Sequence, residues 1–348
     1  MAPRLSDFRG RDNNFNLIRM LAALLVIEAH SCSVSHRADL LRPFFGLGGG
    51  DLGVDIFFVL SGYLIAKSWT GKSWRAFAWA RIMRIYPALW VSTILSIVLV
   101  GLFFSDGGFF VRPSTLSYVW HNATMLPHFS AQTDLPGAFG TAKGHDFNIS
   151  LWTLPYELQM YMMLALVGGI MGLRAPYMAL LALAGGCLAL HFFGAGGVTR
   201  GRLLYFFFSG AVAFTLRERI LLDGRITLAL AAAIAASFLL APAWRGGTLE
   251  FTLPYIVLWC AYIPSGFIRL WNRLGDYSYG SYIFAHPIQM GLAAYGLTTN
   301  WWSNAIASVA IILPIAALSW HFLEKKALAI PMPRAFGLAS ETSRSSSS

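Results

Sequence analysis

The residues of this 348-residue chain that could do chemistry are ionisable side chains set within long apolar stretches. Arg19 and His30 lie eleven residues apart in the first such stretch. On a helix they share one face and lie about 16 Å apart along the axis. A charge at the bilayer centre costs about 2.5–3.5 kcal/mol on insertion scales, so such residues are functional candidates. Because an imidazole titrates near neutral pH, His30 is suited to act as a general base. The alternatives are a histidine hydrogen-bonded between helices and an arginine that extends to the membrane surface.

A second apolar stretch carries Asp55 and the pair Ser61-Gly62. If His30 lies toward the outer end of the first span, the reversed direction of the second span places Asp55 at a similar depth. We therefore expect the Asp55 carboxylate to orient the imidazole. The alternative is a negative charge that only stabilises the start of a helix. The pair Ser61-Gly62 is also typical of the small residues at which membrane helices approach closely.

Two arginines, Arg81 and Arg84, follow in a basic segment. Their i, i+3 spacing makes them neighbours on one helix face. We expect them at the start of a helix, where backbone N–H groups and two guanidiniums together bind phosphate. The alternative is positive charge that only anchors the cytoplasmic end of a span.

Two further apolar stretches each carry a polar face. The first face contains four residues within about 80° of one another, namely Ser150, Thr153, Glu157 and Tyr161. The second contains Tyr279, Tyr282 and His286, at positions i, i+3 and i+7. Both faces predict polar groups turned toward the interior of a helical bundle, where the carboxylate needs a partner or a function. The alternative is hydrogen bonding between helices, worth about 0.6 kcal/mol per contact.

The composition identifies the elements that must position these residues. Apolar residues make up 56% of the chain, and Asp, Glu, Lys and Arg only 12%, against roughly 25% in soluble domains. This excludes a soluble globule and, because the hydrophobicity is high, extensive disorder. Three cysteines far apart exclude a disulfide framework and a CxxC-type zinc site, and we expect no metal. The sequence contains no phosphate-binding loop, HExxH zinc motif or serine-hydrolase elbow.

These properties predict an all-α, polytopic membrane bundle of about ten transmembrane helices, because a span needs about 20 mostly apolar residues. The candidate spans are roughly 15–34, 51–69, 84–104, 150–171, 176–193, 200–217, 226–243, 249–267, 276–297 and 302–323. Residues 105–149 are polar and rich in Gly and Pro, so we expect an external loop with a re-entrant piece around Tyr118–Phe129. The transmembrane domain then covers 15–330, between an N-terminal cytoplasmic segment, 1–14, and a disordered cytoplasmic tail, 331–348.

The distribution of basic residues predicts the orientation. With the N-terminus inside, 18 of the 26 Lys and Arg residues fall on the inner side and seven on the outer side, Arg19 being within a span. This asymmetry follows the positive-inside rule and places both termini in the cytoplasm. The net charge of +10 therefore reflects topology, and we expect no nucleic-acid partner.

Five stretches in order carry a resemblance to a known family. They are Asn16 to Ser31 with its Arg-x10-His spacing, Gly53 to Ile65, Arg81 to Pro87, Ser150 to Glu157, and Gly275 to Pro287. Over about residues 13–330 the chain resembles the acyltransferase 3 family of bacterial integral-membrane O-acyltransferases. The segment Phe322-Leu-Glu-Lys325 is similar to the last helix of that family. Glu28 departs from the pattern, which has an apolar or small residue there.

The resemblance implies a multi-pass acyl-CoA-dependent O-acyltransferase of the bacterial inner membrane. The acyl group, usually acetyl, would pass from cytoplasmic acyl-CoA (acetyl-CoA) to a hydroxyl of a cell-surface glycan or lipid-linked saccharide on the periplasmic side, among membrane lipids. The catalytic residues would be His30, Glu157 and Asp55. The donor would bind Arg19, Arg81, Arg84, Ser61 and Tyr63. The acceptor pocket would contain Ser150, Trp152, Tyr156, Tyr282 and His286.

A transporter or flippase is the alternative function, because such proteins also place His, Glu and Arg within the membrane. It predicts substrate-coupled flux without dependence on acyl-CoA. The sequence leaves open the acceptor sugar and acylated position, the acyl chain, direct transfer against an acyl-histidine intermediate, and the oligomeric state.

Overall fold

The computed structural model describes residues 2–8, 10, 12–45, 47–103, 108–125, 130–138, 147–191, 198–241 and 244–333. Within these ranges the chain folds into helices joined by short connections, and no strand occurs. The all-α prediction is therefore confirmed. Residues 105–107, 126–129 and 139–146 of the predicted external loop, and the tail from 334 onward, lie outside the described residues.

Each predicted span overlaps one of the longer helices in the described part of the chain. These are α1 (Phe15–Val34), α3 (Gly49–Trp69), α4 (Trp74–Phe103), α6 (Leu154–Ile170), α7 (Ala175–His191), α8 (Val198–Thr215), α9 (Gly224–Leu240), α10 (Arg245–Tyr262), α12 (Ser278–Ala294) and α13 (Trp301–Leu318). Short helices connect or extend them: α2 (Arg42–Phe45), α5 (Pro113–Thr124), the 3-10 helices η5 (Ile149–Thr153) and η7 (Gly266–Leu270), α11 (Trp271–Leu274), the π-helix η8 (Ser319–Glu324) and α14 (Lys325–Leu328).

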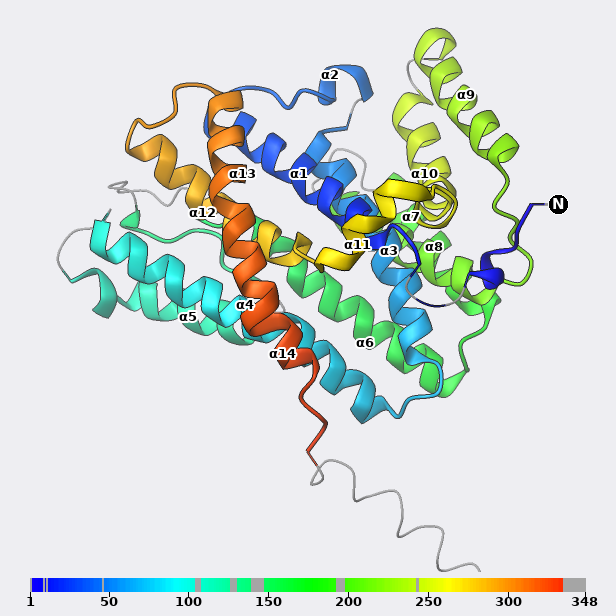
Figure 1. Cartoon of the computed structure of the whole chain (residues 1–348), viewed down its shortest axis with the longest axis horizontal. Coiled ribbons are helices and arrows are strands. Elements are labelled where there is room, and N and C mark those ends of the chain that lie inside the picture. The colour runs from blue at the N-terminus through cyan, green and yellow to red at the C-terminus, as the bar shows by residue number, and fades with distance from the viewer. Residues whose placement is uncertain are drawn as a thin grey trace, which may run out of the picture.

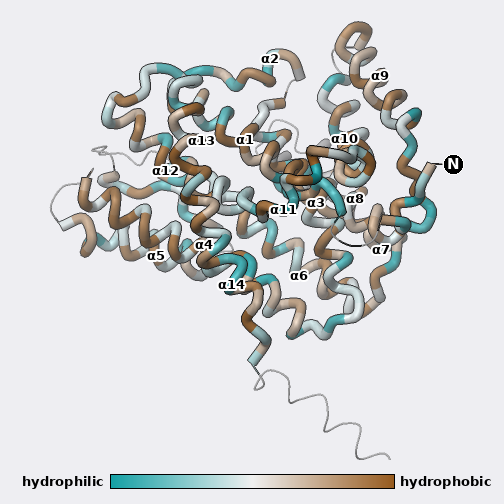
Figure 2. Tube along the Cα trace, viewed as in Figure 1, coloured by the Kyte–Doolittle hydropathy of each residue, from teal (hydrophilic) through white to brown (hydrophobic). Residues whose placement is uncertain are grey.

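Among the described residues, four helical runs are long and apolar enough to cross a membrane. They are α1, α3, α4 and the continuous run Trp301–Leu328, which joins α13 to α14 (Figure 1). The pair α10 and Gly266–Leu274 meets the same test only as one span bent by 88°. Large apolar side chains on the outer faces are exposed, as expected where lipid replaces water, and Figure 2 shows hydrophobic positions along almost every helix. The chain is thus a multi-pass membrane protein, and the count of ten spans stays a prediction.

Helix α1 lies at the centre, against α3, α12 and α13, while α8 packs on α3 and α7 on α8 (Figure 1). The α3–α8 contact depends on glycine. A Cβ on Gly62 would lie 1.7 Å from the carbonyl oxygen of Phe207, and one on Gly210 would lie 2.1 Å from that of Val59. The two backbones therefore touch, which confirms Ser61-Gly62 as a close-packing pair.

Part of the predicted external loop forms α5, which lies along α4. Its last turn is bound to that helix, since Tyr86 and Trp90 donate side-chain hydrogen bonds to the carbonyls of Thr124 and Ala123. The predicted re-entrant piece, Tyr118–Phe129, begins inside α5, and its residues 126–129 lie outside the described part.

Candidate active site

A cavity of about 750 Å³ opens among α1, α3, α4, α6 and α12. We call it the arginine cavity, because three of its five cationic lining residues are the predicted donor-binding arginines. The cations are Arg19, Arg81, Arg84, Arg273 and Lys325, and the lining carboxylates are Glu157 and Asp276. Cations therefore outnumber carboxylates by three, and such a cleft concentrates anionic ligands.

Arg19 and Arg84 are both held by one carboxylate, Asp276, in the loop before α12. The terminal nitrogens of Arg19 and Arg84 lie 2.7 Å and 2.6 Å from the same Asp276 oxygen. Arg84 is also 3.0 Å from Glu324, which is 2% exposed. The Arg84 guanidinium is thus committed to two carboxylates, and it ties α4 to the start of α12 and to η8, the π-helix that follows α13.

Arg81 differs from its neighbour Arg84. Its Nη2 donates a long hydrogen bond of 3.4 Å to Ser68, and its buried Nε has no hydrogen-bond partner within the described residues. No described carboxylate lies within ion-pair distance of it, and its guanidinium lies 5.9 Å from the Tyr161 ring. Unlike Arg19 and Arg84, Arg81 therefore keeps unused donor capacity.

The expected helix start at this arginine pair is wrong. Helix α4 begins at Trp74, so Arg81 and Arg84 lie two to three turns inside it, and their backbone N–H groups belong to a continuous helix. The predicted contribution of a helix N-terminus is absent, and their anion affinity must come from the side chains.

The Glu157 carboxylate lines the same cavity, bonded to neutral hydroxyls. Ser61 Oγ donates to Glu157 Oε1 at 3.0 Å, and the Tyr161 hydroxyl donates to the same oxygen. Thr153 lines the cavity one turn before Glu157. The predicted polar face of this helix is thus confirmed for Thr153, Glu157 and Tyr161. Ser150, in the 3-10 helix η5, lines neither this cavity nor the second one, and its Oγ is buried with no partner among the described residues.

A second cavity, of about 470 Å³, contains His30, and we call it the histidine cavity. Its polar and aromatic lining includes Trp152, Arg37, Arg42, Asp39 and Asp51, so its charges balance. The Nδ1 atom of His30 is buried without a hydrogen-bond partner in the described structure. The His286 ring meets the His30 ring edge-on, with centroids 5.1 Å apart. His286 is itself oriented by a 3.0 Å hydrogen bond from Nδ1 to the Phe147 carbonyl.

The two cavities share a wall. Val54 and Tyr282 line both of them. The Tyr282 hydroxyl lies 2.9 Å from Thr153 Oγ1, and the ring packs edge-on against Phe57 with centroids 5.8 Å apart. A cationic chamber and a chamber containing a histidine thus meet at one tyrosine.

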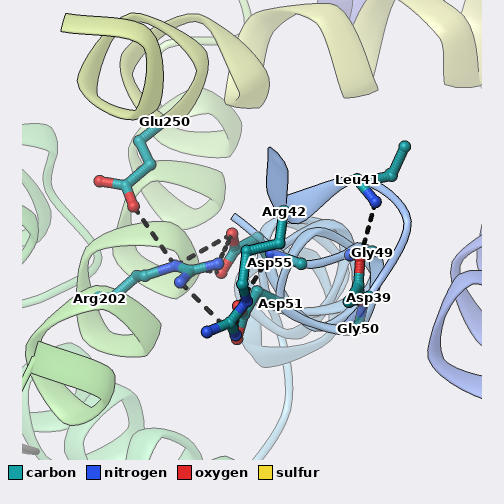
Figure 3. Close-up of polar contacts among 10 residues, drawn as sticks. Asp39, Leu41, Arg42, Gly49, Gly50, Asp51, Asp55, Arg202 and Glu250 are labelled. Carbon is teal, nitrogen blue, oxygen red and sulfur yellow. Dashed lines mark hydrogen bonds and ion pairs between the residues drawn. The ribbon is translucent and has the colours of Figure 1, made fainter. Parts of the chain in front are cut away.

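Asp55 does not bind His30 as expected. Arg202, on α8, donates from Nε to both Asp55 oxygens at 3.0 and 3.1 Å, and also lies 3.5 Å from Glu250 and 3.9 Å from Asp51 (Figure 3). The prediction was wrong because nothing in the sequence indicated that α8 would bring the Arg202 guanidinium to Asp55. Asp55, 1% exposed, is a structural partner that joins α3 to α8.

Three other predicted site residues, Tyr63, Tyr156 and His286, line neither cavity. Tyr63 is two positions from Ser61, which on a helix is 200° around the axis. Its hydroxyl accepts a 3.2 Å hydrogen bond from Tyr262 in the core, so it is not placed to bind a donor in the arginine cavity. Tyr156 accepts a 3.0 Å hydrogen bond from Arg200 and meets the Trp152 ring edge-on.

Sequence reasoning missed the residues that hold the arginines. Asp276 and Glu324 both lie in stretches with family resemblance, yet no partner was assigned to them. In the sequence, Arg273 and Lys325 were used only as basic residues of the predicted inner side, which set the orientation. The position of each carboxylate at the end of an apolar span could have indicated an ion pair, because a carboxylate there needs a cation.

The sequence is similar to one family model and to several known proteins. Residues 12–321 match the family model of an acyltransferase domain. An O-acetyl transferase of Shigella phage Sf6 is 26% identical over 348 residues, covering 93% of this chain and 98% of the relative. Nodulation protein 10 of Rhizobium leguminosarum bv. viciae is 26% identical over 367 residues, covering 94% and 96%. Bacillus subtilis (strain 168) YrhL, provisionally named a peptidoglycan O-acetyltransferase, is 26% identical over 356 residues, covering 88% and 53%. No solved structure matches.

Proposed function

The chain belongs to the acyltransferase 3 family, and we propose that it transfers an acetyl group from cytoplasmic acetyl-CoA to a hydroxyl of a cell-surface or lipid-linked glycan on the periplasmic side of the inner membrane. Membrane O-acetyltransferase activity itself is supported by the family and by its O-acetyltransferase relatives. The use of acetyl-CoA as donor, the transfer on the periplasmic side and the glycan acceptor are what we propose.

One observation carries this proposal: the arginine cavity and the histidine cavity meet at Val54 and Tyr282. Coenzyme A is a polyanion with a long, thin arm that ends in the thioester. A cationic chamber can hold its phosphates while the arm extends toward the shared wall. A hydroxyl in the neighbouring chamber can then reach the thioester without crossing the membrane. A transporter has no need for a cationic chamber that adjoins a second chamber lined by a general base.

The donor site follows from which cations are uncommitted. Arg273 and Lys325 are exposed lining residues at the mouth, and Arg81 is unpaired among the described carboxylates. These three side chains are suited to bind phosphate oxygens. Arg19 and Arg84 keep Asp276 as a partner and contribute mainly shape and net charge. The excess of basic residues on the predicted inner side supports a cytoplasmic opening of this cavity.

His30 is the proposed general base on the acceptor side. Its Nδ1 lies buried and unpartnered in the described structure, and the ring is held edge-on by His286. A neutral imidazole can accept the proton of an attacking hydroxyl and return it to the leaving thiolate. Glu157, bonded by Ser61 and Tyr161 on the donor side, is placed to compensate nearby cationic charge rather than to take that proton.

The histidine cavity has the composition of a saccharide site. Trp152 offers an aromatic face, and Asp39 and Asp51 offer carboxylates to sugar hydroxyls. Asp39 is partly used, because it accepts hydrogen bonds from the backbone N–H groups of Leu41 and Gly49 (Figure 3). The relative provisionally named a peptidoglycan O-acetyltransferase agrees with a glycan acceptor.

The test compares surface glycan from cells with the protein, without it, and with His30→Ala. Mass spectrometry should find alkali-labile acetyl esters only with the wild-type protein. Equal ester content in all three strains, or ester loss without any acetyl-CoA binding by the purified protein, would reject the proposal.

A further inference from the structure

Among the described residues, Tyr282 is the one polar residue that lines both cavities. Of the two residues that line both cavities, Val54 has no hydrogen-bonding side chain, so Tyr282 supplies the polar group in the shared wall. The side chain is 6% exposed, so its hydroxyl is fixed within the protein. Resting on the proposed function, we propose that the Tyr282 hydroxyl is a catalytic residue, which donates a hydrogen bond to the thioester carbonyl oxygen as that oxygen becomes negative.

Neighbouring side chains hold the tyrosine in place from both ends. Its hydroxyl lies 2.9 Å from Thr153 Oγ1, and its ring packs against Phe57. Phe57 in turn lies under the Arg19 guanidinium, 5.9 Å from ring centroid to Cζ. The tyrosine is therefore fixed before substrate arrives, which is the condition for an effective oxyanion donor.

Helix α12 links this hydroxyl to the general base. Tyr282 and His286 are four residues apart, so their side chains lie on the same helix face one turn apart. His286 contacts His30 edge-on, from outside the lining of the histidine cavity. The same helix thus places one polar side chain at the shared wall and the next one against the base.

The Thr153 hydrogen bond leaves the tyrosine able to donate. Either hydroxyl can be the donor in this pair. When Thr153 donates, the Tyr282 oxygen accepts, and its O–H is available to a third atom. Glu157 cannot replace it, because an ionised carboxylate has no proton to donate.

The chemical step balances with these two residues. The acceptor hydroxyl oxygen forms a bond to the thioester carbonyl carbon, and its proton passes to His30. The carbonyl oxygen becomes an oxyanion that accepts the hydrogen bond from Tyr282. The C–S bond then breaks, the carbonyl re-forms, and the coenzyme A thiolate takes the proton from His30. The products are an O-acetyl ester and the free thiol, and both residues return to their starting states.

Tyr282→Phe tests this role, because it removes one oxygen and keeps the ring that closes the wall. The matched control is Tyr262→Phe, which removes another buried tyrosine hydroxyl bonded to a hydroxyl, that of Tyr63, but lines neither cavity. Each protein is assayed in lipid nanodiscs with acetyl-CoA and with de-esterified surface glycan from cells lacking the protein. Thiol release gives kcat, and calorimetry gives the acetyl-CoA Kd.

We expect kcat of Tyr282→Phe to fall on the order of 10²–10³-fold, as when one oxyanion donor is removed. The acetyl-CoA Kd should stay near the wild-type value, and Tyr262→Phe should keep wild-type kcat. Wild-type kcat in Tyr282→Phe, an equal loss in both variants, or a loss explained by weaker donor binding would overturn the role of the hydroxyl. No thiol release by the wild-type protein would instead overturn the proposed function on which the inference rests.

Discussion

Arg84→Lys should damage stability rather than donor binding, although it keeps the positive charge. Arg84 lies 2.6 Å from Asp276 and 3.0 Å from Glu324, with its side chain only 14% exposed. A lysine ammonium is a single point that cannot reproduce the planar fork joining both carboxylates. One lost hydrogen bond to a charged group costs about 1.5–3 kcal/mol. We therefore expect a clearly lower thermal midpoint and an acetyl-CoA Kd near the wild-type value.

Arg81→Lys should have the opposite effect. Arg81 has no carboxylate partner within the described residues, and its Nε makes no hydrogen bond there. Little native bonding is lost, so the thermal midpoint should stay near that of the wild type. Lysine cannot offer several donors to phosphate oxygens at once. Losing one such hydrogen bond, at about 1.5–3 kcal/mol, raises the acetyl-CoA Kd roughly 10- to 150-fold.

The pair is measured side by side in detergent, by calorimetric titration with acetyl-CoA at two salt concentrations and by thermal unfolding. The salt series matters because contacts to phosphate weaken as ionic strength rises. Unchanged donor affinity in Arg81→Lys would remove the proposed phosphate contact. Weakened affinity in Arg84→Lys at an unchanged thermal midpoint would show that Arg84, and not its carboxylate network, meets the donor.

Three further predictions concern the proposed base His30, the ion pair between Arg202 and Asp55, and the close helix contact at Gly62. His30→Ala should lower kcat by about 10²–10⁴-fold with normal membrane insertion, measured by thiol release and gel filtration; retained activity would leave His30 a packing residue. Arg202→Ala should cost about 3–5 kcal/mol by leaving Asp55 buried and unpaired, and an unchanged thermal midpoint would refute this. Gly62→Ala should abolish the folded fraction, because its Cβ would overlap the Phe207 carbonyl, whereas Gly169→Ala, with 3.7 Å of room, should fold.

The fold class was predictable because it follows from composition and hydrophobic length. The ten candidate spans each overlap a longer helix, since apolar runs of that length have few alternatives in a bilayer. The polar face of α6 was also predictable, because the spacing of Thr153, Glu157 and Tyr161 fixes their common direction. Helix geometry also predicted that Arg19 and His30 lie about 16 Å apart on one helix, and the structure has them lining different cavities.

Long-range partners could not be predicted. The Arg202–Asp55 pair joins residues 147 positions apart, and the Arg84–Glu324 pair joins residues 240 apart. Helical periodicity gives the direction of a side chain but not which other helix faces it. For this reason Asp55 was assigned to His30, and Arg84 was taken as free to bind phosphate. The start of α4 was misplaced by about ten residues, because the amphipathic turns before Arg84 are too polar to resemble a span.

The central claim, that the donor enters from one side and the acceptor from the other, is tested most directly in sealed, right-side-out membrane vesicles. Acetyl-CoA labelled in the acetyl group is enclosed inside, and de-esterified glycan is added outside. We predict labelled, alkali-labile ester on the external glycan with the wild-type protein and only background label with His30→Ala. Label that appears only when acetyl-CoA is added to the same side as the glycan would contradict it.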